Sequence, residues 1–459
     1  MLGRQEYQPK LFSTVDIEAL IPPNHFLRKV DKVLDLSFVR DLARDLYCPD
    51  NGRPSIDPEL FFRLVLVSYF YGIDSDHQIC EEVQYNLAYR WFCRLALEDA
   101  VPDHSSMTRI RDRLGEETFK KVFERIVELC KEKGLVKSKS VMTDGTLIKA
   151  NASLNSMVRR DGAPQRDEKL EPPEPPLGPP LKRKLSNETH ISRTDPDSTL
   201  AKKEGSPRTL KYKIHDTIDS ESRVVLDTHV TTGAVHESQV YRDRLNHVEK
   251  TFGLDIEETI ADRAYGTGDI LDDLKGQGVK TNIPLFSSRS GSAAVPEGFE
   301  YEKESDRFRC PEGKYLAPFA TPIKTVKIYH PKAEDCRSCC RKEECNRLTG
   351  NPTRRVRRNI YADLFVQVAA QMETEPFRQK LSERMWKIEG ILAEAKLLHG
   401  LEKARYRRRW KVQVQAYLTA TVQNIKRLVT ALGADLQTFL WEIIGLRFPQ
   451  EIFLRELAA

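Results

Sequence analysis

SVMTDGTLIKA, residues 140–150, is the stretch that decides the fold of this chain. Apolar and β-branched residues alternate along it, and this pattern is typical of a β-strand. Asp144 stands in the middle of the expected strand, between apolar neighbours. A carboxylate in such surroundings costs free energy unless it has a partner. We therefore expect residues 140–150 to form a strand of a sheet, and Asp144 to serve a functional site.

The segments after this strand alternate between expected strands and helices. Residues 210–219, LKYKIHDTID, and residues 223–232, RVVLDTHVTT, are separated by three turn-prone residues, which predicts a hairpin. An expected helix, strand, helix and strand follow, in residues 239–253, 258–266, 269–278 and 279–286. This order predicts an α+β or α/β domain in which helices flank a mixed sheet.

The N-terminal part of the chain has an all-helical pattern. Apolar residues recur at helix spacing in residues 58–72, PELFFRLVLVSYFYG, and in residues 116–134, EETFKKVFERIVELCKEKG. We expect residues 1–135 to form a helical domain for DNA binding or assembly. Trp91 and Phe92 belong to a basic and aromatic stretch that could place a helix on DNA, but core packing is the favoured interpretation for these two rings.

Two insertions and a tail complete the predicted organisation. Residues 158–208 are rich in proline and charge and cannot bury enough surface to offset chain entropy, so we expect disorder there. Residues 301–350 are rich in cysteine. The sheet domain is expected in residues 136–300 and 351–435, with a helical tail in residues 436–459.

Length and composition describe a globular protein of several domains. The chain has 459 residues, 40% apolar and 31% charged, and typical domain sizes suggest roughly two to four units. The sequence shows no secretory signal and no membrane-spanning run, so we expect a cytoplasmic protein without a membrane partner. The net charge is only +5, and nucleic-acid binding would therefore depend on local basic patches.

Two dense basic patches stand in the last third of the chain, from Arg354 to Arg358 and from Lys403 to Lys411. Such patches give salt-dependent affinity for a phosphate backbone without reading its sequence. The alternative is a solvated helix face. The residues expected to contact DNA are Lys396, Arg405, Arg407, Arg408, Arg409 and Lys411.

A second aspartate and a glutamate are candidates to join Asp144. Asp262 follows an expected short strand, and functional groups gather at strand ends in open α/β sheets, so the two aspartates could share a metal ion. An aspartate at a strand end is also a common turn or cap residue. Glu389 borders the apolar face of an expected helix, and Lys396 lies two turns further on the same side.

The third acid stays open at this point. Glu394 and Glu383 lie on the same expected helix as Glu389, and a solvated acidic helix face is the alternative to a site. The apolar face of this helix is expected to consist of Phe377, Leu381, Met385, Ile388, Leu392 and Ala395. His236, just past the expected hairpin, is a candidate supporting group, although a lone histidine is more often structural.

Four thiols, Cys310, Cys336, Cys339 and Cys345, suit a tetrahedral structural Zn²⁺. Cys340 could replace Cys339, and free thiols are the alternative to a zinc site. Such a site would serve stability or DNA contact, because a short insertion has little core of its own.

Several segments resemble the DDE transposases of bacterial insertion sequences. The resemblance is to the insertion-sequence group numbered eleven-eighty-two, which is of the type represented by insertion sequences four and five. The catalytic domain of that family is resembled by MTDGTLIKANAS, by KYKIHDTIDSESRVVLDTHVTTGAVHE and by TIADRAYGTGDILDDLKGQGVKTNIP. Glu389, six intervening residues and Lys396 resemble its glutamate-to-lysine signature, and YRRRWKVQVQAYLTATVQNIKRL is similar to its last helix. The family's arginine one turn before the glutamate, and the tyrosine before that, are missing, although Arg384 and Lys387 lie nearby.

The resemblance implies an RNase H-like fold and phosphoryl transfer with two divalent ions, Mg²⁺ or Mn²⁺. Asp144 would bridge the two ions, and Asp262 and Glu389 would each hold one. Water would nick a transposon end, and the released 3′-hydroxyl would attack target DNA, while Lys396 would bind a phosphate near the cut. The implied partners are double-stranded DNA, as terminal inverted repeats and target, and further copies of the chain in a homodimer or higher oligomer.

Two other function classes remain compatible with the residues. One is a DNA-binding regulator derived from a transposase that has lost catalysis. The other is a metal-dependent nuclease that cuts without strand transfer, because cutting and joining use the same acids. The expected location of the protein is the bacterial cytoplasm, with association to the nucleoid when DNA is bound.

Overall fold

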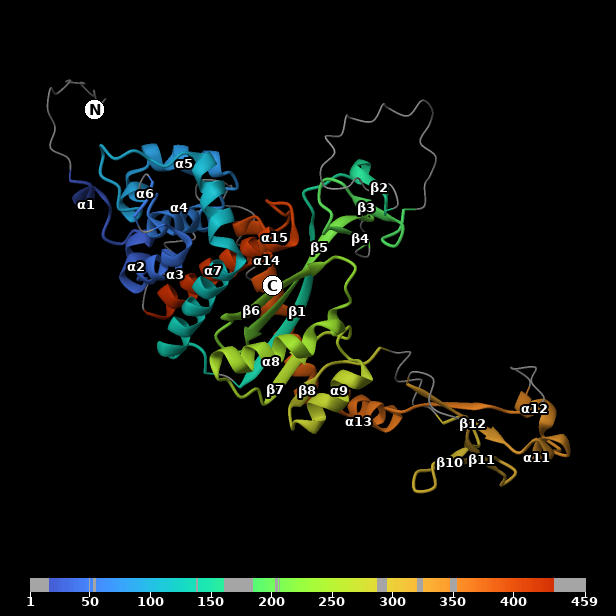
Figure 1. Ribbon diagram of the computed structural model, residues 1–459. Coiled ribbons are helices and arrows are strands. Elements are labelled where there is room, and N and C mark those ends of the chain that lie inside the picture. The colour runs from blue at the N-terminus through green and yellow to red at the C-terminus, as the bar shows by residue number, and fades with distance from the viewer. Residues whose placement is uncertain are drawn as a thin grey trace, which may run out of the picture.

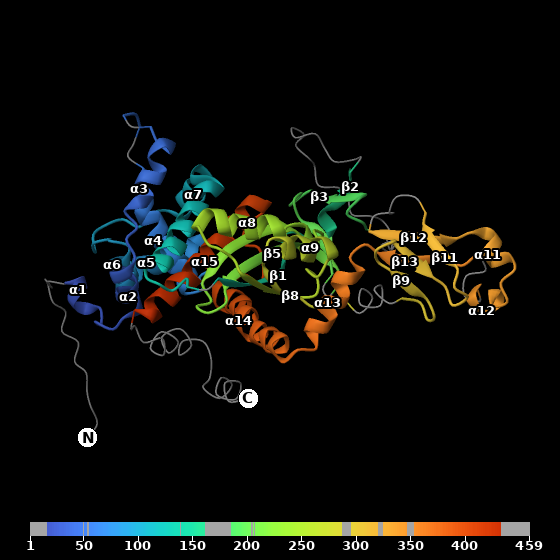
Figure 2. The same ribbon diagram turned by 90° about the horizontal axis from the view of Figure 1, so that it is seen from below.

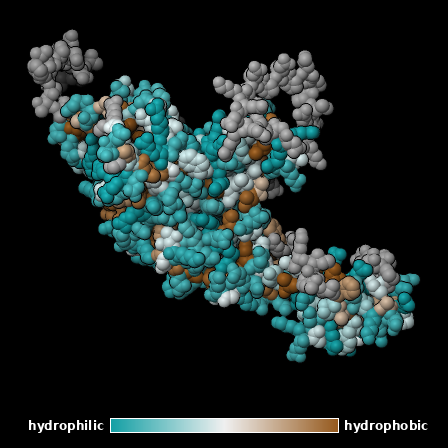
Figure 3. Space-filling view, in the orientation of Figure 1, coloured by the Kyte–Doolittle hydropathy of each residue, from teal (hydrophilic) through white to brown (hydrophobic). Residues whose placement is uncertain are grey.

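The structure is a computed structural model, and its helical domain, sheet domain and cysteine-rich insertion follow one another across the molecule (Figure 1). It describes residues 16–48, 50–52, 55–137, 139–160, 185–202, 205, 207–286, 295–319, 325–346 and 353–432. The helical tail predicted for residues 436–459 lies outside these ranges. The face shown in Figure 3 is mainly hydrophilic, with hydrophobic residues in a band over the middle of the molecule.

The N-terminal domain is all helical, as predicted. Its elements are α1 (Ile17–Leu20), α2 (Phe26–Val33), α3 (Phe38–Ala43), η1 (Arg44–Leu46), α4 (Pro58–Phe70), α5 (Asp76–Tyr85), α6 (Leu87–Phe92) and α7 (His104–Glu132). Helix α4 is apolar on all sides and buried along most of its length, so it forms the centre of the domain. Phe92 is fully buried and Trp91 packs against the same core, which confirms the core interpretation of both rings.

The sheet domain has the predicted mixed sheet. Its strands in the described part of the chain are β1 (Ser140–Lys149), β4 (Thr199–Ala201), β5 (Thr209–Asp219), β6 (Val225–Thr232), β7 (Glu258–Ala261) and β8 (Lys280–Asn282). Strand β5 lies antiparallel between β1 and β6, and β7 and β8 follow on the other side of β1 in parallel. The path β6-β5-β1-β7-β8 is that of an RNase H-like fold, and the hairpin and the two later strands are confirmed.

Helices cover both faces of the sheet. Figure 2 shows α8 (Tyr241–Phe252) and α9 (Gly268–Gly276) on one side of it and α14 (Glu375–His399) on the other. Helix α13 (Ala362–Met372) leads into α14, and η4 (Glu237–Gln239) leads into α8. The apolar face of α14 is confirmed for Phe377, Ile388, Leu392 and Ala395. Met385 is wrong as a core residue: it lies with Trp386 on the exposed side of α14 and is 61% exposed.

Helix α15 (Arg409–Ala431) joins the two domains and is buried along most of its length. It packs against α2, α4 and α7 on one side and against β6 on the other. Asn424 and Gln413 pair with backbone groups of β6, at distances of 2.7 to 2.8 Å. Strand β6 has β5 as its partner on one edge, and these amides satisfy groups on the other edge that burial would leave unpaired.

The prediction of disorder in residues 158–208 is wrong for the described part of that segment. Strands β2 (Met157–Arg159) and β3 (His190–Ser192) pair with each other, and β4 extends the main sheet along β5. Buried Asp195 explains the order, because it accepts a hydrogen bond from the Tyr212 hydroxyl at 2.7 Å and another from the Arg408 backbone at 2.9 Å. Residues 161–184, which hold most of the prolines, lie outside the described residues.

The cysteine-rich insertion has a small antiparallel sheet of its own. Among the described residues it comprises β9 (Glu300–Glu302), β10 (Arg307–Arg309), β11 (Tyr315–Pro318), β12 (Val326–Pro331) and β13 (Val356–Asn359), with α11 (Ala333–Arg337) and α12 (Lys342–Asn346). Phe308, Leu316, Tyr329 and Val356 form its core. The predicted boundary at residue 350 is therefore too early, because β13 pairs with β12 and belongs to the insertion.

Candidate active site between the mixed sheet and helix α14

Asp144 and Asp262 meet where β1 and β7 diverge. The two strands run in parallel register up to the pair Thr143 and Ala261. The residue after each of these is one of the aspartates, Asp144 within β1 and Asp262 just past the end of β7. Parallel neighbours at the same register position face the same side of a sheet. Asp262 also accepts a hydrogen bond from the Ala264 backbone at 2.7 Å, which fixes its side chain at the start of the following turn. The structure thus brings together the two aspartates that the strand pattern predicted.

Arg384 connects this pair of aspartates to Glu389. Its guanidinium forms an ion pair of 2.9 Å with Asp144 and lies 4.0 Å from the Glu389 carboxylate. Arg384 is buried, whereas the Glu389 side chain is 55% exposed. Lys380, one turn earlier, pairs with Glu258 of β7 at 2.9 Å and ties the helix to the sheet. Helix α14 therefore presents Glu389 to the same end of the sheet as the two aspartates.

Burial and neighbouring acids control the charge of Asp144. Burial raises the pKa of Asp144 to about 6, while the Arg384 guanidinium and a hydrogen bond from the Gly145 backbone lower it. The negative charges of Asp262 and Glu237 contribute to this increase. A carboxyl with such a pKa is charged at neutral pH but holds its proton more readily than a surface aspartate. A cation beside it would favour the charged form.

The two alternatives for the third acid have structural roles. Glu394 is held between α14 and α15 by Lys426 at 2.5 Å and Arg427 at 3.0 Å, with His399 at 3.5 Å. The hydrogen bond from His399 and the two positive charges keep the pKa of Glu394 well below its usual range, against the effect of burial. Glu383 pairs with Lys387 one turn along α14. Neither arrangement leaves a carboxylate directed to the aspartates.

A further acid at this end of the sheet was missed from the sequence. Glu237, in η4, lies beside Gly145, where an added Cβ atom would stand 3.0 Å from the glutamate's Cγ and Oε1 atoms. It forms an ion pair of 3.0 Å with Lys213 of β5. His236, the neighbouring residue, was the candidate predicted from the sequence, but its imidazole caps η4 and pairs with Ser238 at 2.7 Å. The one available signal was an acid directly after the hairpin.

The donor set suits a hard divalent cation, because carboxylate oxygens are the ligands that Mg²⁺ and Mn²⁺ prefer. Within the described ranges, however, no three His, Cys, Asp or Glu side chains are gathered closely enough to hold a metal ion. The acids are paired with protein cations instead: Asp144 with Arg384, and Glu237 with Lys213. Binding of a metal would require these side chains to exchange partners.

The residues predicted to contact DNA divide into two groups. Arg407, Arg408 and Arg409 are exposed in the turn before and at the start of α15. Arg405 is different, because its side chain is only 7% exposed, pairs with Asp74 at 2.9 Å and stacks on Tyr69. It fastens the end of α14 to the helical domain. Lys411 pairs with Asp112 of α7, and Lys396 is half-buried on α14.

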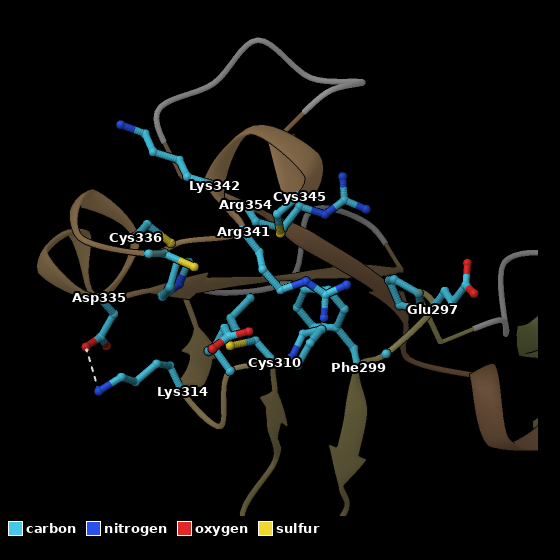
Figure 4. Close-up of a pocket in the computed structure, with 17 residues that line it drawn as sticks. Glu297, Phe299, Cys310, Lys314, Asp335, Cys336, Arg341, Lys342, Cys345 and Arg354 are labelled. Atoms are coloured by element: carbon cyan, nitrogen blue, oxygen red, sulfur yellow. Dashed lines mark ion pairs between the residues drawn. The ribbon is translucent and has the colours of Figure 1, made fainter.

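The four predicted zinc thiols line one cavity of the insertion, as Figure 4 shows for three of them. Cys310 follows β10, Cys336 lies in α11, Cys339 follows α11, and Cys345 lies in α12. The cavity measures about 490 Å³, whereas a water molecule occupies about 30 Å³, so the thiols do not enclose an ion-sized space. Arg341 reaches across it, and Lys314 pairs with Asp335 at its rim, 3.8 Å apart.

Two segments of the chain match transposase families. Residues 15–113 match a family described as "Transposase domain (DUF772)", and residues 309–429 match one described as "Transposase DDE domain". The first covers most of the helical domain, and the second covers most of the insertion with α13, α14 and nearly all of α15. Together they support a DDE transposase. Asp144 and Asp262 lie between the two matched segments of this transposase-like chain, and Glu389 lies within the second.

Comparison with solved structures returns further transposases at low similarity. The piggyBac transposase synaptic complex with hairpin DNA is 9% identical, covers 94% of this chain and 84% of its own, and has a TM-score of 0.37. The Mos1 transposase paired-end complex with the left transposon end is 12% identical, covers 54% of this chain and 64% of its own, and has a TM-score of 0.17. Scores this low add nothing to the family matches. No curated protein matches the chain.

Proposed function

We propose that this chain is a DDE transposase that cleaves the ends of a transposon and joins them to target DNA with the help of divalent metal ions. The observation that carries the proposal is the meeting of Asp144 and Asp262 at the diverging ends of β1 and β7, with Glu389 linked to them through Arg384. Membership of the eleven-eighty-two group of insertion sequences is part of the same proposal. The matches to two transposase families support it.

The proposed roles follow from burial and position. When bound, a pair of divalent ions would activate the attacking water or 3′-hydroxyl and stabilise the leaving oxygen. Asp144 is more enclosed than Glu389, at 15% against 55% exposed, and would contact both ions, while Asp262 and Glu389 would each contact one. Before the ions bind, Arg384 holds Asp144 in place and neutralises part of the negative charge of the acids. The exposure of Glu389 leaves its carboxylate free to turn toward the aspartates.

Double-stranded DNA is the proposed partner, as terminal inverted repeats and as target. The exposed Arg407, Arg408 and Arg409 come shortly after α14 and are the proposed phosphate contacts, together with Lys396 on α14. Arg405 is left out of this set, because its guanidinium is already engaged inside the protein. Transposon ends are cut and joined in pairs, and we therefore propose that a homodimer or higher oligomer acts.

We also propose that the thiols of the insertion bind a structural Zn²⁺. Their common cavity supports this, and so does the position of Cys310, Cys336 and Cys339 around it. Burial raises the pKa of the Cys345 thiol, and the negative charges that Cys336, Cys339 and Cys310 would carry as thiolates contribute to the same increase. Zinc would remove that repulsion. Cys340 is exposed and stands outside the cavity lining.

The proposed function is tested by strand cleavage on DNA that carries the terminal repeats flanking the gene. We expect Asp144→Asn and Asp262→Asn to lower the cleavage rate by roughly 10³-fold or more, because each substitution removes a carboxylate that would hold the divalent ions. DNA binding should persist in both. Glu257→Gln is the matched control, since this exposed acid pairs with Lys139 at the far end of β7. Unchanged cleavage by either asparagine variant would remove that residue from the mechanism.

Pre-cleaved transposon ends separate the three function classes. A transposase joins such ends to a target plasmid, whereas a nuclease without strand transfer cuts intact ends and leaves pre-cleaved ones unjoined. A regulator derived from a transposase binds the ends and does neither. Joining that depends on Asp144 and Asp262 is the expected result.

A further inference from the structure

The small sheet of the insertion packs its core against one of its two faces. On that face Leu316 of β11 and Pro331 of β12 lie opposite each other and also line the thiol cavity. Successive side chains of a strand point to opposite faces of a sheet, so the residues before each of these lie on the second face, called the outer face. The outer face is therefore separate from the proposed zinc site. The residues of the outer face that matter here are Arg307, Tyr315, Phe319, His330, Arg355 and Arg357.

Three aromatic rings stand on the outer face. The Phe319 ring is 64% exposed and stacks on the His330 imidazole, with the ring centroids 4.6 Å apart and an interplanar angle of 20°. Tyr315 is 42% exposed, and the Arg307 guanidinium lies 3.8 Å from the centroid of its ring. A single exposed apolar residue is ordinary on a protein surface. Exposed rings gathered on one face of a sheet are instead typical of surfaces that bind flat partners by stacking.

The edge of the outer face at β9 is electrically balanced. Glu302 of β9 pairs with Arg307 of β10 at 2.7 Å, and Glu300 lies 3.9 Å from Arg309. The ion pair with Glu302 holds the Arg307 guanidinium in position over the Tyr315 ring. An anionic partner would thus gain little electrostatic energy at this edge, and its contacts here would be with the rings.

The opposite edge, at β13, is positive. Of the arginines in the basic patch that the sequence showed there, Arg354 lines the thiol cavity and Arg358 lies over an aromatic ring on the core side. Arg355 and Arg357 are exposed on the outer face. Burial and the positive charge of Arg355 lower the pKa of His330, so the imidazole that supports the Phe319 ring is neutral at pH 7. The rings therefore lie beside a row of exposed cations.

This combination of rings and cations fits a chain of nucleotides better than a peptide. Bases stack on exposed aromatic side chains, and the phosphates that connect them bind arginine. An acidic peptide would pair with the arginines but would offer no flat groups to the rings. A DNA duplex hides the faces of its bases within its own stack, so the bases that reach these rings must be unpaired.

We propose that the outer face of the insertion binds single-stranded DNA, with bases stacked on Phe319 and Tyr315 and phosphates bound by Arg355 and Arg357. The inference rests on the proposed function, since cleaved transposon ends are the source of the unpaired nucleotides. It assigns the insertion a contact with DNA that is separate from the zinc site and from the arginines before α15. The projection of the insertion away from the rest of the molecule (Figure 1) leaves room for such a strand.

The test measures binding of a labelled oligothymidylate of about 12 nucleotides to the full-length protein by fluorescence anisotropy, without added Mg²⁺ or Mn²⁺. We expect Phe319→Ala to weaken binding of the single strand by about tenfold, because one stacking platform is lost, and to leave binding of a duplex unchanged. Phe319→Trp should bind as the wild type does, since it keeps an aromatic ring. Val366→Ala is the control, because Val366 is an exposed apolar residue of α13 outside the insertion.

Two further measurements separate stacking from attraction of charges. Arg357→Gln should weaken binding and reduce its dependence on salt, because one phosphate contact is lost. Ultraviolet crosslinking of an oligonucleotide that contains iododeoxyuridine should join the wild-type protein at residues 315–330, and mass spectrometry of the peptides locates the crosslink. Crosslinking uses the unaltered chain, so its result does not depend on how the variants fold.

Several outcomes would overturn the inference. One is single-strand binding that is unchanged in Phe319→Ala and in Arg357→Gln, and another is a crosslink that maps outside the insertion. Equal losses for duplex and single strand in Phe319→Ala would exclude stacking of bases. Tighter binding of an oligouridylate RNA than of the DNA would assign the face to RNA, and an altered oligomeric state with normal DNA binding would assign it to a protein.

The proposed function fails or stands by a different measurement, because binding is recorded without turnover. If Asp144→Asn and Asp262→Asn cleave normally while Phe319→Ala loses the single strand, the metal-dependent mechanism is wrong and the contact with DNA remains. If the two asparagine variants lose cleavage while Phe319→Ala binds the single strand normally, the proposed function stands and this inference is wrong.

Discussion

Asp216 shows how strongly acids interact on this sheet. It lies opposite Asp144 in the register of β5 and β1, and it is buried with one carboxylate oxygen unpaired among the described residues. Burial raises the pKa of Asp216 to about 7, helped by the charges of Asp227 and Asp144, while a hydrogen bond with Thr228 lowers it. At neutral pH this carboxyl is therefore close to half protonated. Asp216 thus holds a proton more readily than a surface aspartate, at the position opposite Asp144 in the sheet.

Asp216→Asn tests this at the scale of one residue. Because the folded-state pKa lies above the ordinary value, the folded chain binds more protons than the unfolded chain between about pH 4 and 7. The free energy of unfolding of the wild type should therefore fall as pH rises through this window. In the variant, which has no carboxyl at this position, this contribution to the fall should be absent. Between pH 5 and pH 8, we expect the free energy of unfolding of the variant, measured with urea, to rise by roughly 2 kcal/mol relative to that of the wild type. Parallel stability curves for the two proteins would show that Asp216 titrates normally.

At the scale of elements, helix α14 carries two glutamates with separate tasks. Glu389 is exposed at the end nearest the aspartates, whereas Glu394 is enclosed with Lys426, Arg427 and His399 against α15. The helix geometry separates them, because five residues rotate a side chain well away from the first direction. One face of α14 thus serves the site, and the other fastens the helix to α15.

Paired substitutions distinguish these two tasks. Glu394→Gln should lower the free energy of unfolding by about 3 kcal/mol, because it leaves two buried cations without their anion. Glu389→Gln should change stability by no more than about 0.5 kcal/mol, since its side chain is exposed, and should abolish cleavage. Thermal unfolding and the cleavage assay on the same preparations supply both readouts. A stable Glu394→Gln that cannot cleave would instead make Glu394 the third acid.

At the scale of the whole molecule, α15 is the element that unites the domains. It packs on three helices of the N-terminal domain and borders β6 through Asn424 and Gln413. Arg405 adds a second connection, from the end of α14 to Asp74. The cysteine-rich insertion has its own small core and projects from the opposite end (Figure 1). In the part of the chain that the structure describes, no helix is long and apolar enough to cross a membrane.

The zinc proposal belongs to this scale, because the insertion is an independent unit. We expect the purified protein to contain about one zinc per chain by elemental analysis, as tetrahedral thiolate sites hold one ion. Cys336→Ser should lose that zinc and make residues 295–359 sensitive to protease. Unfolding of the sheet domain should hardly change, since the insertion's core of Phe308, Leu316, Tyr329 and Val356 is separate. Purified protein without zinc, or a Cys336→Ser variant that retains it, would contradict the proposal.

The sequence by itself determined the elements and the two aspartates of the site. Strand alternation and helix periodicity are local properties, so β1, the hairpin of β5 and β6, and the long helices were readable from neighbouring residues. Asp144 and Asp262 were recognisable because each interrupts or ends an apolar strand. The same local reasoning failed at residues 185–202, where Asp195 and Tyr212 supply order that composition does not reveal.

Only the tertiary structure decided which polar residues face the site and which hold the fold. Arg384 reaches Asp144, Glu237 packs on Gly145, and Arg405 is enclosed by the helical domain, although in the sequence all three are ordinary charged residues. The physical reason is that burial and pairing depend on segments far apart in the chain. The periodicity of a helix or strand indicates the direction in which a side chain points. The residue that this side chain contacts is decided by how other elements pack against its own.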